Sequence, residues 1–308
     1  MSRPPHLTLP PHARAYALRT ERGAFAVHDA SPAGPPTGTA LLVPGFTGSK
    51  EDFITLLEPL ATAGFRVVAV DGRGQYESDG PADVSAYARA ELARDVLAQA
   101  VAVGAGGPVH LLGHSLGGLV ARSAVLRDAA PFASLTLMSA GPGPVAEAQR
   151  ARLTLLTEAL ATLDMEQVWQ AMRQLDPPEA AGEAEPVAVR EFLHRRWMDT
   201  RPEQLVATAR QLMDEEDRVA ELAELALPVH VISGAVDYAW PVPRLDAMAT
   251  RLGAHRSVIA GAEHSPAVDR PVETARALAA FWHTATPAPP TRARGGAHPA
   301  SEGVRGRG

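Results

Sequence analysis

Two features of the sequence predict an α/β protein whose mostly parallel sheet is flanked by helices. Short apolar runs rich in β-forming residues alternate with helical segments, which is typical of a parallel sheet covered on both faces. One run, near residue 109, leads into a glycine-rich turn and then into a helical stretch. The six apolar runs are Thr39–Val43, Phe65–Val70, Val109–Leu112, Leu135–Met138, Val229–Ile232 and Ser257–Ile259.

The chain is expected to open with an antiparallel hairpin, because residues 14–19 and 24–29 alternate loosely around the turn signal Glu21-Arg22-Gly23. Apolar residues at helical spacing indicate two helices on the sheet. The first set is Val84, Ala88, Leu92 and Val96, and the second is Ala275, Leu278, Ala279 and Trp282.

The alternation stops between residues 145 and 225, where no convincing strand occurs. This stretch holds the amphipathic segments RLTLLTEALATL and QVWQAMRQL and the loop-like insert DPPEAAGEAEP, so we expect a helical insertion folded over the sheet. Residues 14–144 and 226–284 then form the core. Residues 285–308 are rich in Pro, Gly, Ala and Arg and are expected to be a disordered tail, because they have too little apolar surface to bury.

The composition excludes several classes of protein. A chain of 308 residues is long enough to bury a sizeable core, and its net charge of −6 argues against a uniformly basic nucleic-acid binder. The absence of cysteine excludes disulfides, thiolate metal sites and a cysteine nucleophile. No secretory signal or long apolar run is visible, so the expectation is a soluble cytoplasmic protein with no membrane partner. The sequence does not indicate the oligomeric state.

The segment Gly113-His114-Ser115-Leu116-Gly117 matches the pattern G-x-S-x-G. An apolar strand ends at Leu112, and a helical stretch begins just after Gly118. A tight strand-to-helix turn of this kind holds its serine in a strained conformation and projects the hydroxyl out of the sheet. The sequence therefore predicts Ser115 as a nucleophile.

A serine hydroxyl needs a base, and the base needs an orienting carboxylate. Of eleven histidines, His264 lies in a loop that follows a late strand, Ser257–Ile259, where it would overhang the carboxyl edge of the sheet. Asp237 follows the strand Val229–Ile232 at the same edge. The chain order Ser115, Asp237, His264 is that of one class of hydrolase, so Asp237 is the predicted acid and His264 the predicted base.

The turn Pro44-Gly45-Phe46-Thr47-Gly48-Ser49 follows the strand Thr39–Val43. The backbone N–H groups of Phe46 and Leu116 would converge on the oxyanion that develops in the transition state. Each such donor contributes about 3 to 4 kcal/mol, by analogy with measured removals. We therefore predict Phe46 and Leu116 as the oxyanion hole.

These segments together resemble the α/β-hydrolase fold superfamily over about residues 14–284. The resemblance is carried by Pro44-Gly-Phe-Thr-Gly-Ser, Asp71-Gly-Arg-Gly, Gly113-His-Ser-Leu-Gly-Gly, Gly234-Ala-Val-Asp and Gly261-Ala-Glu-His. It implies an eight-stranded, mostly parallel sheet with an antiparallel second strand and a helical cap at 145–225. It also implies the nucleophile, acid, base and oxyanion roles given above. Pro44 is a departure, because many members have a histidine at this position.

The resemblance narrows the chemistry. Relatives that open epoxides or displace halide use an aspartate as nucleophile, which Ser115 argues against. Tyr238 and Trp240 flank the acid, and Trp169 and Trp197 lie in the insertion. Together they would suit a mainly apolar acyl group, although Trp169 and Trp197 would equally fit the core of the cap.

The main hypothesis is a serine hydrolase, similar to carboxylesterases, that cleaves a small, mainly apolar carboxylic ester through an acyl-enzyme, with no metal and no cofactor. An acyltransferase, a thioesterase or lactonase, or a carbon–carbon bond hydrolase on the same three residues stays open, because the fold alone does not choose among them. A non-catalytic ligand-binding relative is the third hypothesis.

Overall fold

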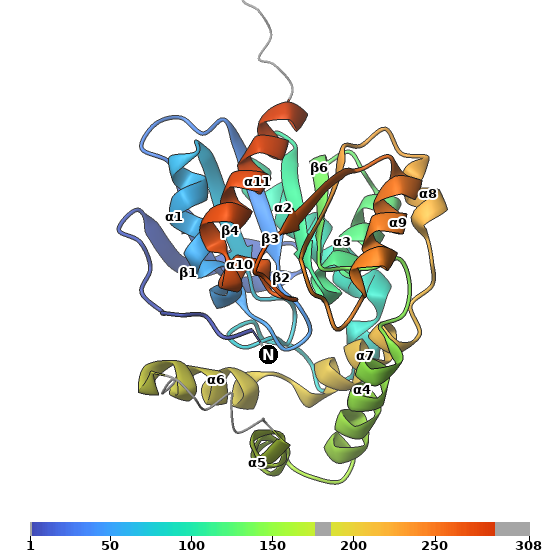
Figure 1. Cartoon of the computed structure of the whole chain (residues 1–308). Helices are drawn as coiled ribbons and strands as arrows, with labels where there is room; N and C mark the ends of the chain where they lie inside the picture. The colour runs from blue at the N-terminus through green and yellow to red at the C-terminus, as the bar shows by residue number, and fades with distance from the viewer. Residues whose placement is uncertain (1, 176–185, 287–308) are drawn as a thin grey trace, which may run out of the picture.

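The computed structural model describes residues 2–175 and 186–286, and within them an eight-stranded sheet forms the centre of the molecule (Figure 1). The strand order is β1-β2-β4-β3-β5-β6-β7-β8. The strands are β1 Ala13–Thr20, β2 Gly23–Ala30, β3 Gly38–Val43, β4 Phe65–Val70, β5 Val109–His114, β6 Phe132–Met138, β7 Val229–Gly234 and β8 His255–Ile259. All six predicted apolar strands are confirmed, with ends that differ by a few residues.

The opening hairpin and the mixed character of the sheet are also confirmed. Strands β1 and β2 pair antiparallel, with Thr20 opposite Gly23 across a two-residue turn. Gly23 has φ 131°, a conformation that a side chain would strain. β2 pairs antiparallel with β4. The five remaining pairs, β4–β3, β3–β5, β5–β6, β6–β7 and β7–β8, are all parallel.

Helices cover both faces of the sheet. They are η1 Lys50–Phe53, α1 Ile54–Thr62, η2 Val84–Tyr87, α2 Arg89–Gly104, α3 Leu116–Arg127, α4 Glu147–Leu160, α5 Met165–Leu175, α6 Val187–Asp199, α7 Pro202–Met213, α8 Val219–Ala223, α9 Val242–Leu252, α10 Pro266–Asp269 and α11 Pro271–Ala285. No helix in the described ranges is long and apolar enough to cross a membrane.

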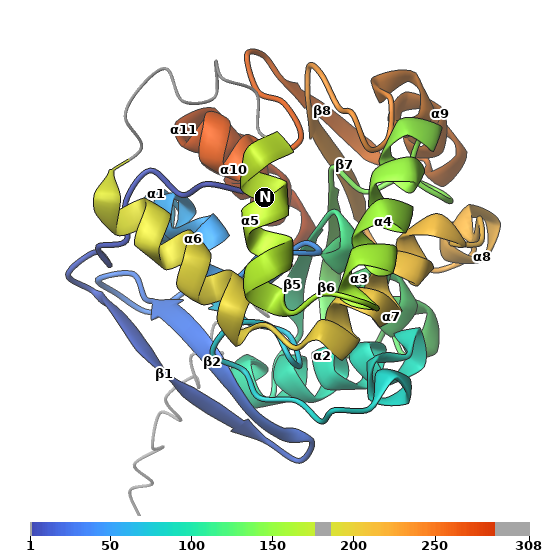
Figure 2. The same ribbon diagram turned by 90° about the horizontal axis from the view of Figure 1, so that it is seen from below.

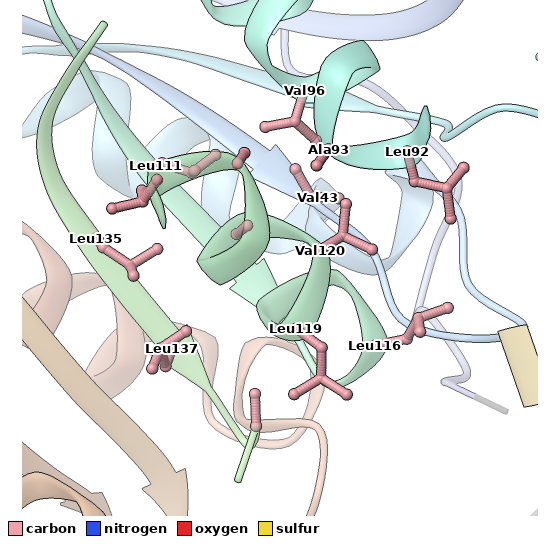
Figure 3. Close-up of a cluster of buried hydrophobic side chains, with 14 of the residues drawn as sticks. Val43, Leu92, Ala93, Val96, Leu111, Leu116, Leu119, Val120, Leu135 and Leu137 are labelled. Atoms are coloured by element: carbon pink, nitrogen blue, oxygen red, sulfur yellow. The ribbon is translucent and has the colours of Figure 1, made fainter. Parts of the chain in front are cut away.

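Two apolar clusters hold the layers together. On one face, α2 and α3 pack on the central strands, and Figure 3 shows Val96 of α2 and Val120 of α3 around Val43 of β3 in the same cluster as Leu111 of β5. On the other face, α1 and α11 pack together, with Trp282 fully buried. The predicted apolar face of the last helix is confirmed, because Ala275, Leu278, Ala279 and Trp282 are all buried.

The predicted helix through Val84 and Val96 is wrong at its start. A short 3-10 helix, η2, ends at Tyr87, and the backbone is extended at Ala88 before α2 begins. The break has a local cause, because the Tyr87 side chain is fully buried and its hydroxyl donates to Pro81 O at 2.7 Å. Val84 is consequently 39% exposed, whereas Leu92 and Val96 are buried as predicted.

Five helices, α4 to α8, connect β6 to β7 where the helical insertion was expected. Helices α4 to α7 lie beyond the carboxyl edge of the strands, and Figure 2 looks onto this edge with α4 to α6 in front. Helices α5 and α6 share their own apolar cluster, whereas α8 packs beside α9 of the sheet domain. Of the loop-like insert at 176–186, only Pro186 lies within the described residues.

The predicted tail from residue 285 lies outside the described residues, apart from its first two. Ala285 ends α11, and Thr286 Oγ1 donates to Trp282 O at 2.7 Å. These two residues therefore belong to the folded domain, and the tail prediction is wrong for them.

Buried histidines predict acid sensitivity of the fold. Burial lowers the pKa of His230 in β7 to about 3, and its Nδ1 has no hydrogen-bond partner in the described structure. Burial also lowers the pKa of His28, His110 and His114, each to about 4. In each case the unfolded chain binds a proton near pH 6.5 that the folded state does not bind. The stability that these neutral side chains provide is therefore complete above pH 6.5 and is lost as pH falls toward 4.

We expect the free energy of unfolding to fall steeply between pH 6.5 and 4.5, with each such histidine contributing about 1.4 kcal/mol per pH unit. His230→Gln should reduce that fall by about 2 kcal/mol over the interval, because one linked proton is removed. Urea unfolding at a series of pH values measures this. The exposed neighbour His255 provides the control, since His255→Gln should leave the slope close to that of the unmodified chain. Equal slopes in all three proteins would contradict the prediction.

Candidate active site

The turn between β5 and α3 places Ser115 at the carboxyl edge of the sheet. Ser115 has φ 53° and ψ −119°, an unfavourable backbone conformation for a residue with a side chain. The turn is tight, because a Cβ on Gly113 would lie 2.2 Å from Gly117 O, and one on Gly117 would lie 2.4 Å from Val43 O. Gly113 and Gly117 are therefore required at these positions, because a side chain at either one would clash with the backbone.

The structure brings together the three residues predicted as nucleophile, base and acid. Ser115 Oγ lies 3.1 Å from His264 Nε2, and His264 Nδ1 lies 3.0 Å from each carboxylate oxygen of Asp237. All three side chains are buried. A carboxylate only accepts hydrogen bonds, so Nδ1 carries the proton and the Nε2 lone pair faces the serine hydroxyl.

Asp237 is itself held in place by the loop that follows β7. Its Oδ1 accepts the N–H groups of Ala239 at 2.8 Å and Trp240 at 3.0 Å. The imidazole of His264 is enclosed by neighbouring rings, with the Tyr238 ring centroid 4.8 Å away and that of Trp240 6.4 Å away. Asp237 and His264 thus have one defined orientation toward Ser115.

The side chain of His114 contacts the backbone of His264, a contact that sequence reasoning did not anticipate. Burial lowers the pKa of His114 to about 4, so the ring is neutral at physiological pH. Its Nε2 lies 2.8 Å from His264 O and donates to that carbonyl. The ring therefore fixes the loop that carries His264 and does not contact Ser115 as a base.

One predicted oxyanion donor, Leu116, directly follows Ser115, and the other, Phe46, lines the same cavity as Ser115. Leu116 is the first residue of α3, where N–H groups lack an acceptor within the helix. Phe46 belongs to the turn at residues 44–49, which is closed by the Gly48 N–H donating to Gly45 O and so does not use the Phe46 N–H. The turn approaches the nucleophile closely, since a Cβ on Gly45 would lie 3.3 Å from Ser115 Cβ.

A second loop, at residues 71–75, holds this turn in place. Gln75 Nε2 donates to Gly45 O at 2.8 Å, and its Oε1 accepts the Gly72 N–H at 3.0 Å. Asp71 Oδ1 accepts the Lys50 N–H at 2.7 Å, just beyond the turn. The sequence marked this segment through Asp71-Gly-Arg-Gly, but nothing in the pattern showed that Gln75 supports the oxyanion turn.

Gln75→Leu is expected to lower kcat for an ester substrate roughly 10- to 100-fold with little change in KM. The loss should be smaller than the 100- to 1000-fold typical of deleting a direct oxyanion donor, because Gln75 acts through Gly45. Steady-state kinetics tests this against Gln99→Leu, since Gln99 is a buried glutamine that lines, together with Gln75, a cavity of about 30 Å³ that does not include Ser115 or His264. Comparable losses of kcat in both variants would show a general packing effect and contradict the positioning role.

A cavity of about 100 Å³ adjoins Ser115 and His264. Phe46 and Tyr238 line it, together with side chains from the insertion, Gln149 of α4 and Leu212 of α7. Its remaining walls include polar groups, Ser2, Thr47, Asp52 and Ser265. Among the described residues no cluster of His, Asp and Glu side chains is arranged to hold a metal ion.

The four predicted substrate-binding residues occupy different places. Tyr238 lines the cavity. Trp240 is fully buried behind His264, where its Nε1 donates to Gly143 O at 2.8 Å. Trp169 and Trp197 pack in the apolar cluster of α5 and α6, and Trp197 Nε1 donates to Met165 O. These two residues lie in the apolar interior of the insertion, which is the alternative that the sequence left open.

Comparison with known proteins places this geometry in context. A model of the alpha/beta hydrolase family matches residues 40–277. A curated protein of Variovorax paradoxus, named "Putative carbamate hydrolase RutD", is 42% identical over 127 residues, which is 40% of this chain and 47% of that protein. The match thus spans about half the length of that curated relative.

Solved structures of other proteins are similar to this structure over most of the chain. A hydrolase from Pseudomonas aeruginosa has a TM-score of 0.71 and 26% identity, covering 87% of this chain and 98% of that one. A thermophilic esterase from Thermogutta terrifontis also has a TM-score of 0.71, with 22% identity over 89% of this chain and 100% of that one. The predicted fold is therefore confirmed.

Proposed function

This chain belongs to the alpha/beta hydrolase family, and we propose that it is a serine hydrolase that cleaves a small carboxylic ester through an acyl-enzyme. The observation that carries the proposal is the chain of contacts from Asp237 through His264 to Ser115. Esterases among its structural neighbours support it.

In the proposed reaction, His264 Nε2 takes the proton of Ser115 Oγ as that oxygen attacks the ester carbonyl. The N–H groups of Phe46 and Leu116 stabilise the oxyanion, and Asp237 stabilises the imidazolium that forms. His264 then protonates the leaving alcohol, and the acyl group remains on Ser115. Water, deprotonated by His264, attacks the acyl-enzyme through a second oxyanion and releases the acid.

The cavity of about 100 Å³ beside Ser115 supports a small substrate. We also propose that residues 145–225 act as a cap over a core of residues 14–144 and 226–284. Gln149 and Leu212 support this role, because both belong to the insertion and line the cavity.

Hydrolysis of a carbamate is a second candidate, favoured by the 42% identity to the protein named as a carbamate hydrolase. For a carbamate ester the same nucleophile, base and oxyanion donors would serve. The alcohol leaves first, and water then releases a carbamic acid that decomposes to an amine and carbon dioxide. Transfer of the acyl group to an acceptor other than water, and thioester, lactone or carbon–carbon bond cleavage, use these groups equally.

A fluorophosphonate probe and a substrate panel test the proposal together. The probe should label Ser115 and block turnover of short 4-nitrophenyl esters, because it reacts with an activated serine. Initial rates on matched esters, thioesters, lactones and carbamates, with and without competing alcohols, identify the preferred chemistry. Peptide mapping that finds no label on Ser115 in folded protein would overturn the proposal.

A further inference from the structure

Asp52 lies in η1, directly after the oxyanion turn, and lines the same cavity as Ser115 and His264. Its side chain is nearly fully buried. Its Oδ1 accepts a hydrogen bond from Arg196 Nη1 of α6 at 2.7 Å. The proposed reaction uses neither residue.

The second carboxylate oxygen of Asp52 has no hydrogen-bond partner within the described structure. Gly48, which also lines the cavity, makes room for this oxygen, since a Cβ there would lie only 2.4 Å from Oδ2. A buried carboxylate oxygen without a donor is unfavourable, and such groups usually have a partner. Burial also raises the pKa of Asp52 even though Arg196 opposes that shift.

The surroundings define which donor would suit this oxygen. Arg196 is buried and its guanidinium already pairs with the carboxylate, so a neutral donor is enough to complete the hydrogen bonding of Oδ2. The small volume of the cavity favours a compact group. A hydroxyl group is both neutral and compact, and it donates one hydrogen bond.

We propose that Asp52 is a specificity residue whose Oδ2 accepts a hydrogen bond from a hydroxyl group of the substrate, so that the site selects hydroxylated small esters. This inference rests on the proposed ester hydrolysis. It differs from the sequence-based expectation of a mainly apolar substrate, because it requires a hydroxyl group on the substrate. The other polar walls, Thr47 and Gln149, agree with a substrate that is not purely hydrocarbon. A substrate that fills the site would complete the hydrogen bonding of Asp52.

Matched esters test the proposal on both sides of the ester bond. The acyl series compares 4-nitrophenyl butyrate, 3-hydroxypropionate and methoxyacetate, which have equal numbers of heavy atoms and differ in the donor. The alcohol series compares propyl acetate with 2-hydroxyethyl acetate. In at least one series we expect kcat/KM to favour the hydroxylated substrate at least tenfold over its matched partners.

The informative quantity is the ratio of kcat/KM values within one protein, because the fraction of folded enzyme cancels. Comparing that ratio between variants also cancels the intrinsic reactivity of each ester. Asp52→Leu combined with Arg196→Met removes the whole buried pair, so no lone charge remains, and it should bring the preference near or below one. Asp52→Asn should retain part of the preference, because an amide oxygen still accepts a hydrogen bond.

The matched control is Asp29→Leu with Arg66→Met, a pair with a fully buried carboxylate in the hairpin region, away from the cavity, and it should leave the ratio unchanged. If Ser115-dependent hydrolysis occurs but the ratio is the same with and without Asp52, the specificity proposal alone is wrong. If no ester is hydrolysed in a Ser115-dependent way, the proposed function is wrong and this inference falls with it.

Discussion

Ser115→Ala is expected to lower kcat/KM for the preferred ester by a factor of about 1000 to 1,000,000. The serine oxygen forms the covalent intermediate, so its loss removes the whole acyl-enzyme route. A residual rate above that in water should persist, because the N–H groups of Phe46 and Leu116 still stabilise an oxyanion. The stability of the fold should change little, since within residues 2–175 and 186–286 the Ser115 hydroxyl has one side-chain partner, His264.

Steady-state kinetics and labelling by a fluorophosphonate probe measure this effect, with thermal unfolding to show that the variant is folded. Ser123→Ala is the matched control, because Ser123 lies on α3, the helix that begins just after Ser115, and its hydroxyl donates to Leu119 O within that helix. It should keep both activity and labelling. A folded Ser115→Ala protein that hydrolyses esters at the normal rate would contradict the proposed mechanism.

Local sequence signals predicted most of the fold. Runs such as Phe65–Val70 are apolar, contain β-branched residues and end in turn-forming residues, so their strand character is independent of distant contacts. The exception at Val84 shows the limit of periodicity. Its spacing to Val96 is helical, but burial of Tyr87 and the bond from its hydroxyl to Pro81 O break the helix between them.

The candidate site likewise contains residues that local sequence signals predicted and residues that they did not. Ser115, Asp237 and His264 each follow a predicted strand, so parallel topology alone places them at one edge, and the structure brings them into contact. Their catalytic role stays a prediction. Gln75 also follows a predicted strand, but nothing in the sequence marked Gln75 or Asp52 for the contacts they make. Those contacts, with Gly45 and Arg196, join residues that are distant in sequence, and only the folded chain defines them.

Asp237→Asn is expected to lower kcat about 10,000-fold near neutral pH while KM changes little. The physical reason is the pattern of donors around the side chain. Oδ1 accepts the N–H groups of Ala239 and Trp240, so the amide oxygen of an asparagine must occupy that position. The amide nitrogen then takes the place of Oδ2 and donates to His264 Nδ1, which forces the proton of the imidazole onto Nε2. In that tautomer the base has no lone pair facing Ser115, a situation that costs a factor of about 10,000 in a related arrangement.

The comparison with Asp237→Ala separates this tautomer effect from a loss of structure. Alanine leaves the N–H groups of Ala239 and Trp240 without their acceptor, so this variant should lose stability as well as activity. Asparagine preserves both hydrogen bonds, so Asp237→Asn should unfold close to the temperature of the unmodified chain even though it is nearly inactive. Thermal unfolding together with kcat and KM distinguishes the two variants. An Asp237→Asn protein that retains a tenth or more of the normal kcat would show that His264 does not need this carboxylate, and the assignment of Asp237 as the orienting acid would then be wrong.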